Sequence, residues 1–163
     1  MAKKDILEYM KLKGVRLSKN VVPIEYDLQL KPDLDNFTFE GVETITLSIL
    51  KKTKTLTLHS KDLEIETVRM GELFGEVSYN QKDETVTFIF PKSIPIGKIK
   101  LTIFFKGILN EEMRGFYRSK YNILDKEHHI ATTQFEATDA MRAFPCFDEP
   151  AQKAVFHISL ITQ

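Results

Sequence analysis

The sequence predicts an all-β fold of several antiparallel sheets, preceded by one short helix. After Pro23, the apolar residues Ile24, Tyr26, Leu28 and Leu30 alternate with polar ones. Strand side chains point to alternate faces, so this period of two is typical of a half-buried strand. Similar runs recur at short intervals, and only the first residues show helical spacing. The crossover helices of a parallel sheet are therefore missing.

The helix is predicted over residues 5–13. Asp5 and Glu8 have the spacing of a capping box, apolar residues follow at helical spacing, and Gly14 provides a stop. Such a helix either binds a partner or packs at the domain edge and frays, and we favour the second because chain ends commonly do so. We therefore divide the chain into a helical extension, residues 1–17, and one β domain, residues 18–163.

Nine or ten strands are predicted after the helix. The candidates are residues 24–30, 37–49, 55–59, 63–69, 76–80, 85–90, 99–106, 115–121, 129–135 and 154–161. The polar connection at 79–84 suits a hairpin, and the two prolines in 91–97 cannot continue a ladder. The last strand runs almost to the final residue without a closing turn, so we expect a domain truncated at its C-terminal end.

Composition bounds the class of protein. The 163 residues suit one domain that buries about 70% of its unfolded surface, and 12 Phe and 5 Tyr supply a core. Lys plus Arg and Asp plus Glu balance at 23 each, which argues against nucleic acid or a membrane surface as a partner.

The start of the chain and its cysteine content predict a cytoplasmic protein. No apolar run approaches the roughly 20 residues that span a bilayer, and the first residues lack the apolar segment of a signal peptide. The single cysteine, Cys146, cannot form an internal disulfide, which fits a reducing compartment.

Gln134 and Glu136 form a candidate binding pair. On one strand, residues two apart face the same way and lie roughly 7 Å apart. A carboxylate beside an amide carbonyl suits a ligand's ammonium group, because both accept hydrogen bonds and one supplies the opposite charge. The same pair is also common on the solvated side of antiparallel sheets, so the pair alone leaves both interpretations open.

The surrounding segment carries a resemblance to a known family. Residues 132–156 read TTQFEATDAMRAFPCFDEPAQKAVF, with RGFYRSKY at 114–121, FTFEG at 37–41 and PDL at 32–34. Together they resemble the N-terminal domain of gluzincin-class zinc aminopeptidases, the family of aminopeptidase N, nearest its puromycin-sensitive branch. The resemblance runs from Val15 to the last residue. It departs at Met141 and Phe147, where that branch usually has arginine and tryptophan, which leaves substrate preference open.

The resemblance implies a specific role for this chain. It implies a saddle-like β sandwich in which the residues matching Gln134 and Glu136 bind a substrate's N-terminal amine, beside a catalytic zinc held by a following domain. That domain is absent here, so we expect no catalytic residue and no zinc in the fragment, which alone would be inactive. The implied partners are peptides with a free N-terminus and the catalytic domain, and the implied reaction is zinc-dependent removal of single N-terminal residues.

The histidines give no sign of a zinc site in this chain. The motif H-E-x-x-H, which places two ligands on one helix face, does not occur. His128 and His129 are adjacent, so on a strand they would face opposite ways and could not easily chelate one ion. We predict instead that they lie in a solvated turn. His59 and His157 are isolated, and we predict structural roles for both.

The remaining polar residues of the signature segment are predicted to be structural. Cys146 lies among Phe144, Pro145 and Phe147, which favours a small buried side chain over a reactive thiolate. Arg142 is predicted to brace the loop by bidentate bonding to a carboxylate. We expect structural roles over acid–base chemistry for the charged residues of this segment, namely Asp139, Arg142, Asp148 and Glu149.

A second class of function remains open. A noncatalytic β-sandwich module could bind a protein or peptide through an exposed sheet edge. This alternative predicts that no activity depends on Glu136.

Overall fold

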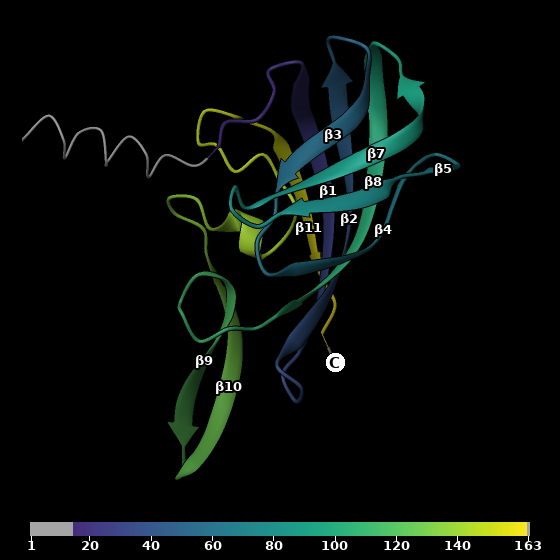
Figure 1. The fold of residues 1–163 in the computed structure, drawn as a ribbon. Helices are drawn as coiled ribbons and strands as arrows, with labels where there is room; N and C mark the ends of the chain where they lie inside the picture. The colour runs from purple at the N-terminus through teal and green to yellow at the C-terminus, as the bar shows by residue number, and fades with distance from the viewer. Residues whose placement is uncertain (1–14, 163) are drawn as a thin grey trace, which may run out of the picture.

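The computed structural model describes residues 15–162 and confirms the all-β prediction (Figure 1). The strands are β1 (Val21–Asp33), β2 (Thr38–Ile49), β3 (Thr53–His59), β4 (Leu63–Met70), β5 (Leu73–Phe74), β6 (Glu76–Asn80), β7 (Thr85–Ile94), β8 (Gly97–Ile108), β9 (Gly115–Ile123), β10 (Lys126–Gln134) and β11 (Val155–Leu160). A short 3-10 helix, η1, covers Ala140–Arg142. The helix predicted over 5–13 lies outside the described residues. No helix within 15–162 is long and apolar enough to cross a membrane.

The strands form three sheets. Six strands pair in the order β11-β1-β2-β8-β4-β5, three pair as β3-β7-β6, and β9 pairs with β10 alone. Figure 1 shows β3 and β7 lying across the long strands β1, β2 and β8. Every second residue of β2 from Phe39 to Ile49 is buried, and the apolar ones join a single core cluster with residues of β3, β7 and β8. The alternation seen in the sequence therefore marks the face that each strand turns to this core.

Two glycines let neighbouring strands pack phenylalanine rings over their backbones. Gly41 of β2 stands opposite Phe105 of β8, and Phe39 of β2 stands opposite Gly107 of β8. A methyl group added at either glycine would overlap the opposite phenylalanine ring. The two phenylalanines are almost fully buried, at 1% exposure each. The Phe-x-Gly pattern at 39–41 thus has a packing cause in this sheet.

The last strand corrects the expectation of purely antiparallel pairing. β11 pairs with β1 in parallel, from Glu25 opposite Val155 to Leu30 opposite Leu160. The other side of β1 is occupied by β2, so the returning chain can add only at the free edge. Its direction is set by the long irregular connection through η1, which serves as the crossover in place of a helix.

Pro91 does not end its strand as predicted. β7 continues to Ile94, because the ladder with β3 is irregular there: Thr55 pairs with Ile89 and Thr53 with Ile94. Pro91 falls between these pairs, where its missing N–H removes no ladder hydrogen bond. The two-residue strand β5 was not predicted, since two residues are too few to show a period.

Glu43 places a carboxyl group in the core. It occupies a buried position of β2 with 0% exposure, and neither carboxyl oxygen has a hydrogen-bond partner among residues 15–162. Burial raises its pKa well above the ordinary value for a glutamate. Its titratable neighbours Tyr26 and Cys146 are also buried, and burial raises the pKa of each. Glu43 therefore lies among neutral groups and gains no compensating cation there.

We expect Gly107→Ala to lower the free energy of unfolding by about 1–3 kcal/mol, the usual cost of overpacking a core. Combined with Phe39→Leu, which removes the overlapped ring atoms, the alanine should cost less than it does alone. Urea unfolding of the single and double variants measures both. If the two substitutions lower the free energy of unfolding additively, the proposed overlap between residue 107 and the Phe39 ring is contradicted.

We expect Glu43 to make stability fall as pH rises. Its pKa is higher in the folded chain than the roughly 4.3 of an unfolded glutamate. The linked stabilisation is therefore complete below that unfolded pKa and is lost as pH rises through the folded pKa. Relative to Glu43→Gln, which cannot titrate, the parent should lose stability across this range in urea unfolding at a series of pH values. Parallel profiles would show that Glu43 does not titrate as a buried group.

The free-energy cost of burying the polar carboxyl group of Glu43 can be measured separately from the effect of its titration. Glu43→Met keeps the unbranched shape and removes both unpaired oxygens, so it should raise the free energy of unfolding at neutral pH by about 1–3 kcal/mol. Glu43→Gln, still polar, should gain less than Glu43→Met. A methionine variant less stable than the parent at neutral pH would mean that the carboxyl group is satisfied.

Candidate functional site

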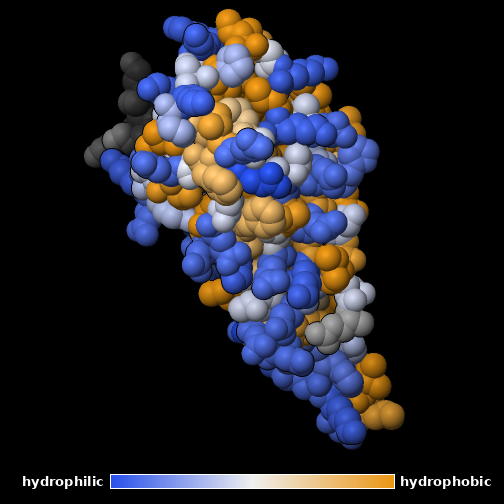
Figure 2. All heavy atoms as spheres, turned by 90° about the vertical axis from the view of Figure 1, so that its right-hand side faces the viewer, coloured by the Kyte–Doolittle hydropathy of each residue, from blue (hydrophilic) through white to orange (hydrophobic). Residues whose placement is uncertain are grey.

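The hairpin β9–β10 carries the candidate site at its base. It projects from the sandwich, and Figure 2 shows the molecule tapering along it. Phe37, in the turn just before β2, anchors the hairpin: the Arg118 guanidinium lies 4.2 Å from its ring centre and the His129 ring 4.7 Å. Phe116 of β9 packs edge-on against Phe39 at 5.1 Å. Aromatic contacts therefore fix the base of the hairpin against the core.

The histidines of β10 correct one prediction. His128 and His129 lie within the strand, not in a solvated turn, and the turn comes earlier, at Leu124 and Asp125. As expected for adjacent strand residues, they contact different neighbours: His128 stacks on Tyr121 at 5.5 Å, while His129 meets Phe37.

Gln134 and Glu136 do not share a strand, which corrects the basis on which they were paired. β10 ends at Gln134, and Glu136 lies in the turn that follows. The reason is local: the Glu136 backbone N–H donates to Gln134 Oε1 at 3.1 Å and closes the turn. Both side chains are nevertheless exposed and line the same polar hollow of about 440 Å³. The structure thus brings the two predicted residues together by a turn.

The polar hollow contains charges that are mostly paired. Lys61 and Glu84 form an ion pair on its wall, and Arg142 bonds to carboxylates beside it. Glu136, by contrast, makes no ion pair with any residue from 15 to 162. Its carboxylate is therefore available to a cationic ligand.

Glu136 also borders a second, more apolar hollow of about 420 Å³. Aromatic side chains form its wall: Tyr26 and Phe156 stack at 4.7 Å, and Phe144 packs edge-on against both. Glu136 therefore stands between a polar and an aromatic surface, where an ammonium group and an attached apolar side chain can be accommodated together.

Arg142 braces the loop, but not by the predicted bidentate bond to one carboxylate. Its Nε donates to Asp139 Oδ1 at 3.0 Å and its Nη1 to Asp62 Oδ2 at 2.6 Å, with Glu112 at 3.8 Å. The arginine side chain is 9% exposed. Gly115 permits this approach, since a side chain there would collide with Arg142 and its φ of +67° favours glycine. Arg142 thereby ties η1 to the β3–β4 turn.

His59 and the carboxylates after η1 complete the anchoring. The Asp148 N–H donates to His59 Nδ1 at 3.1 Å, so His59 Nε2 carries the hydrogen that meets the Val15 carbonyl at 2.6 Å. The Met141 N–H donates to Asp148 Oδ2, and the Leu17 N–H donates to a Glu149 oxygen at 2.8 Å. Burial raises the pKa of Asp148, while the Met141 N–H opposes that shift. These contacts agree with the predicted structural roles.

Cys146 is the buried side chain that the sequence predicted. It is 4% exposed, and its backbone exchanges hydrogen bonds with that of His59 at 2.8 and 3.0 Å. Burial is the main cause that raises its pKa, with smaller contributions from the charges of Asp148 and Glu43. A thiol held protonated is a poor nucleophile. Met141 and Phe147, the two departures from the family pattern, are buried as well.

The described residues offer no donor set for a metal ion. Among residues 15–162, no three His, Cys, Asp or Glu side chains are grouped as a metal site would require. His157, at the surface, pairs with Glu25 at 2.9 Å instead.

Comparison with known proteins identifies the family. Residues 22–163 match the family model described as the Peptidase M1 N-terminal domain. The chain belongs to the M1 peptidase family. The resemblance seen in the sequence is thereby confirmed, and the chain is the N-terminal domain of an M1 protein.

Curated relatives are aminopeptidases by name. The chain is 46% identical over 147 residues to "Aminopeptidase 2" of Candida albicans, covering 89% of this chain and 16% of the relative. It is 42% identical over 148 residues to "Aminopeptidase M1-B" of Oryza sativa subsp. japonica, covering 89% and 17%. "Aminopeptidase 2, mitochondrial" of Saccharomyces cerevisiae is 43% identical over 153 residues, covering 90% and 16%. The chain thus spans about a sixth of the length of these M1 relatives.

We expect Arg142→Ala to lower the free energy of unfolding by about 1–3 kcal/mol, because it removes charge-assisted hydrogen bonds to Asp139 and Asp62. The gain from Asp62 is discounted, since that side chain is 66% exposed. Arg69→Ala is the matched control: Arg69 is exposed, and its side chain makes one hydrogen bond within residues 15–162, to the Gly71 carbonyl at 3.3 Å, so its loss should be within about 0.5 kcal/mol. Equal losses in chemical unfolding would contradict the bracing role.

Proposed function

We propose that this chain is the domain that anchors the substrate's N-terminal amine in an aminopeptidase that removes single residues from peptides. The observation that supports it is Glu136, whose exposed carboxylate makes no ion pair within residues 15–162 and shares the polar hollow with Gln134. A carboxylate so placed accepts hydrogen bonds from an ammonium group and supplies the opposite charge. Holding the amine fixes the first peptide bond at a set distance, which accounts for exopeptidase action.

Gln134 assists and contributes less. Its side-chain oxygen already accepts the Glu136 N–H at 3.1 Å. An amide oxygen has two lone pairs, so one remains for the substrate's ammonium group. Gln134 therefore both shapes the turn that presents Glu136 and offers a second, neutral acceptor.

The catalytic groups belong to other parts of the protein. We propose that the zinc and the base are held by a catalytic domain that docks against this one, and that this chain alone is inactive and zinc-free. The residues described here do not fit a zinc site, so no step through the metal is derived from them. The proposed location is cytoplasmic. The term mitochondrial is part of the name of the Saccharomyces cerevisiae relative and is not transferred to this chain.

A noncatalytic β module that binds a protein is the competing function. The observation in its favour is β11, an edge strand on which Val155, Phe156, Ile158 and Leu160 are 46–63% exposed. An apolar edge suits strand addition by a partner. The same surface suits another part of an M1 protein, so dependence on Glu136 separates the two proposals.

In the full-length enzyme, Glu136→Ala should lower kcat/KM on short peptides by about ten- to 150-fold, because hydrogen bonds to charged groups contribute about 1.5–3 kcal/mol. Gln134→Ala should lose less, since the acceptor is neutral. Steady-state kinetics measures both, with Glu72→Ala in the exposed β4–β5 turn as a matched control expected near wild type.

Two outcomes would count against this assignment. Wild-type kcat/KM for Glu136→Ala would remove its proposed role and favour the binding module. A larger loss for Gln134→Ala than for Glu136→Ala would reverse their ranking. Separately, peptide hydrolysis by the purified 163-residue chain, with tightly bound zinc, would contradict the placing of the catalytic groups elsewhere.

A further inference from the structure

The charges of this chain are unevenly distributed, although their sum is zero. Residues 15–24, 45–60 and 85–105 contain no Asp or Glu. They contain eight basic residues: Arg16, Lys19, Lys51, Lys52, Lys54, Lys92, Lys98 and Lys100. All eight are exposed, and none forms an ion pair with another residue of the described range. We call this group the basic end.

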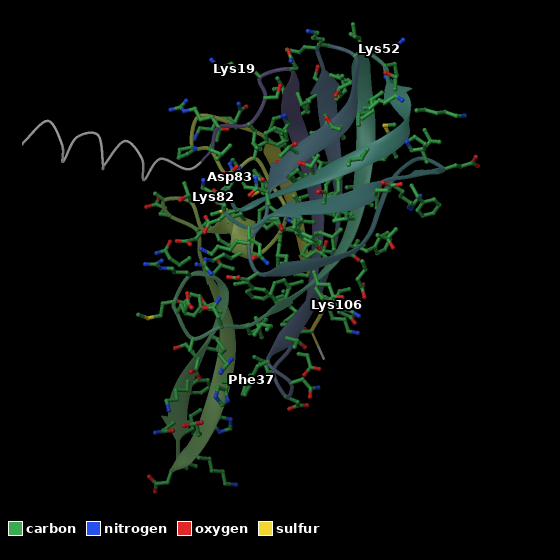
Figure 3. All side chains as sticks on the ribbon, in the orientation of Figure 1. Lys19, Phe37, Lys52, Lys82, Asp83 and Lys106 are labelled. Atoms are coloured by element: carbon green, nitrogen blue, oxygen red, sulfur yellow. The ribbon has the colours of Figure 1, made fainter. Side chains whose placement is uncertain are left out.

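Strand pairing brings the three segments to one place. The Leu50 N–H donates to the Asn20 carbonyl at 2.8 Å, which joins the entry to β1 with the β2–β3 turn. Ile49 pairs with Gly97 and Thr53 with Ile94, which joins that turn to the β7–β8 turn. Figure 3 shows Lys19 and Lys52 at this same end of the molecule, far along the fold from the β9–β10 hairpin.

Apolar side chains stand among these cations. Leu50, in the β2–β3 turn, is 55% exposed, and Ile96, in the β7–β8 turn, is 68% exposed. Hydrophobic spheres lie among hydrophilic ones at the top of Figure 2. Exposed aliphatic residues at the tips of turns, surrounded by lysines, suit an interface where apolar groups enter an acyl layer and cations meet its headgroups.

The basic end also has a hollow for an anionic headgroup. A space of about 440 Å³ lies between the entry to β1 and β3, bordered by Arg16, Lys51 and Lys52. Ser18 and Asn20 border it as well, and their side chains supply neutral hydrogen-bond donors. Phosphate and carboxylate groups accept from both kinds of donor.

We propose that the basic end docks this domain on an anionic phospholipid membrane. A nucleic acid is the weaker partner, since residues 15–20, 50–54 and 91–98 include no aromatic side chain on which bases could stack. The balanced net charge of the chain argued against both a membrane and a nucleic acid. The attraction to a membrane, however, depends on the charges within about 10 Å of its surface and not on the net charge of the whole chain. The proposal is independent of peptide hydrolysis.

Co-sedimentation with phosphatidylcholine vesicles, with and without phosphatidylserine, tests the proposal. The chain should bind only the phosphatidylserine vesicles and should bind less at higher salt. Lys51→Glu, Lys52→Glu and Lys98→Glu together should lower the partition coefficient roughly 100-fold or more, since each basic residue near such a surface contributes about fivefold. Thermal unfolding checks that these exposed substitutions leave the fold intact.

Matched controls separate the basic end from overall charge. Lys82→Glu, Lys126→Glu and Lys153→Glu change the net charge equally at exposed positions elsewhere and should lower binding by about threefold or less. Leu50→Ser with Ile96→Ser should weaken binding while leaving its salt dependence unchanged, because they remove apolar contacts only.

Three results would overturn the proposal. The first is no binding of the parent chain to phosphatidylserine vesicles. The second is an equal loss in both lysine triples, which would show attraction by total charge alone. The third is tighter binding of a fluorescent single-stranded oligonucleotide than of the vesicles, lost in the Lys51, Lys52 and Lys98 triple, which would assign the basic end to nucleic acid.

Discussion

The placement of the candidate site depends on one imidazole, that of His59. Both of its nitrogens are used: Nδ1 accepts the Asp148 N–H, and Nε2 donates to the Val15 carbonyl. This selects the neutral tautomer with its hydrogen on Nε2. The segment that enters the sandwich and the loop that returns from the hairpin are thereby held to the same strand, β3. Glu136 can remain exposed in that loop because its neighbours further along are buried and bonded.

The strands were predictable because each buries one face, so period two in the sequence survives in the structure. In β2 the same period places Glu43 on the face of Ile45 and Leu47, and the structure buries all three. The charge of Glu43 predicts exposure to solvent, whereas its position in the alternating pattern predicts burial. The position decides, because a single residue cannot leave the face of a paired strand. The period of two does not predict which strands pair with each other. β11 pairs with β1, which precedes it by more than a hundred residues.

The candidate site was predictable by residue type but not by geometry. Gln134 and Glu136 are acceptors at a suitable spacing, yet the strand ends between them. The Gln134 side chain accepts a hydrogen bond from the Glu136 backbone N–H, which closes a turn there. Arg142 could be recognised as a brace, but Asp62, its partner across 80 residues, could not. Such contacts depend on which turns the sheets bring together. Local sequence therefore suggests the chemistry of a site and leaves its geometry to the long-range packing.

The distribution of charge over the domain also depends on long-range strand pairing. A net charge of zero averages over the chain, whereas the acid-free segments are collected by strand pairing at one end of the sandwich. The hairpin that carries Gln134 extends from the other end (Figure 1). Substitutions in the proposed membrane surface and in the proposed amine site therefore fall on different elements of the fold.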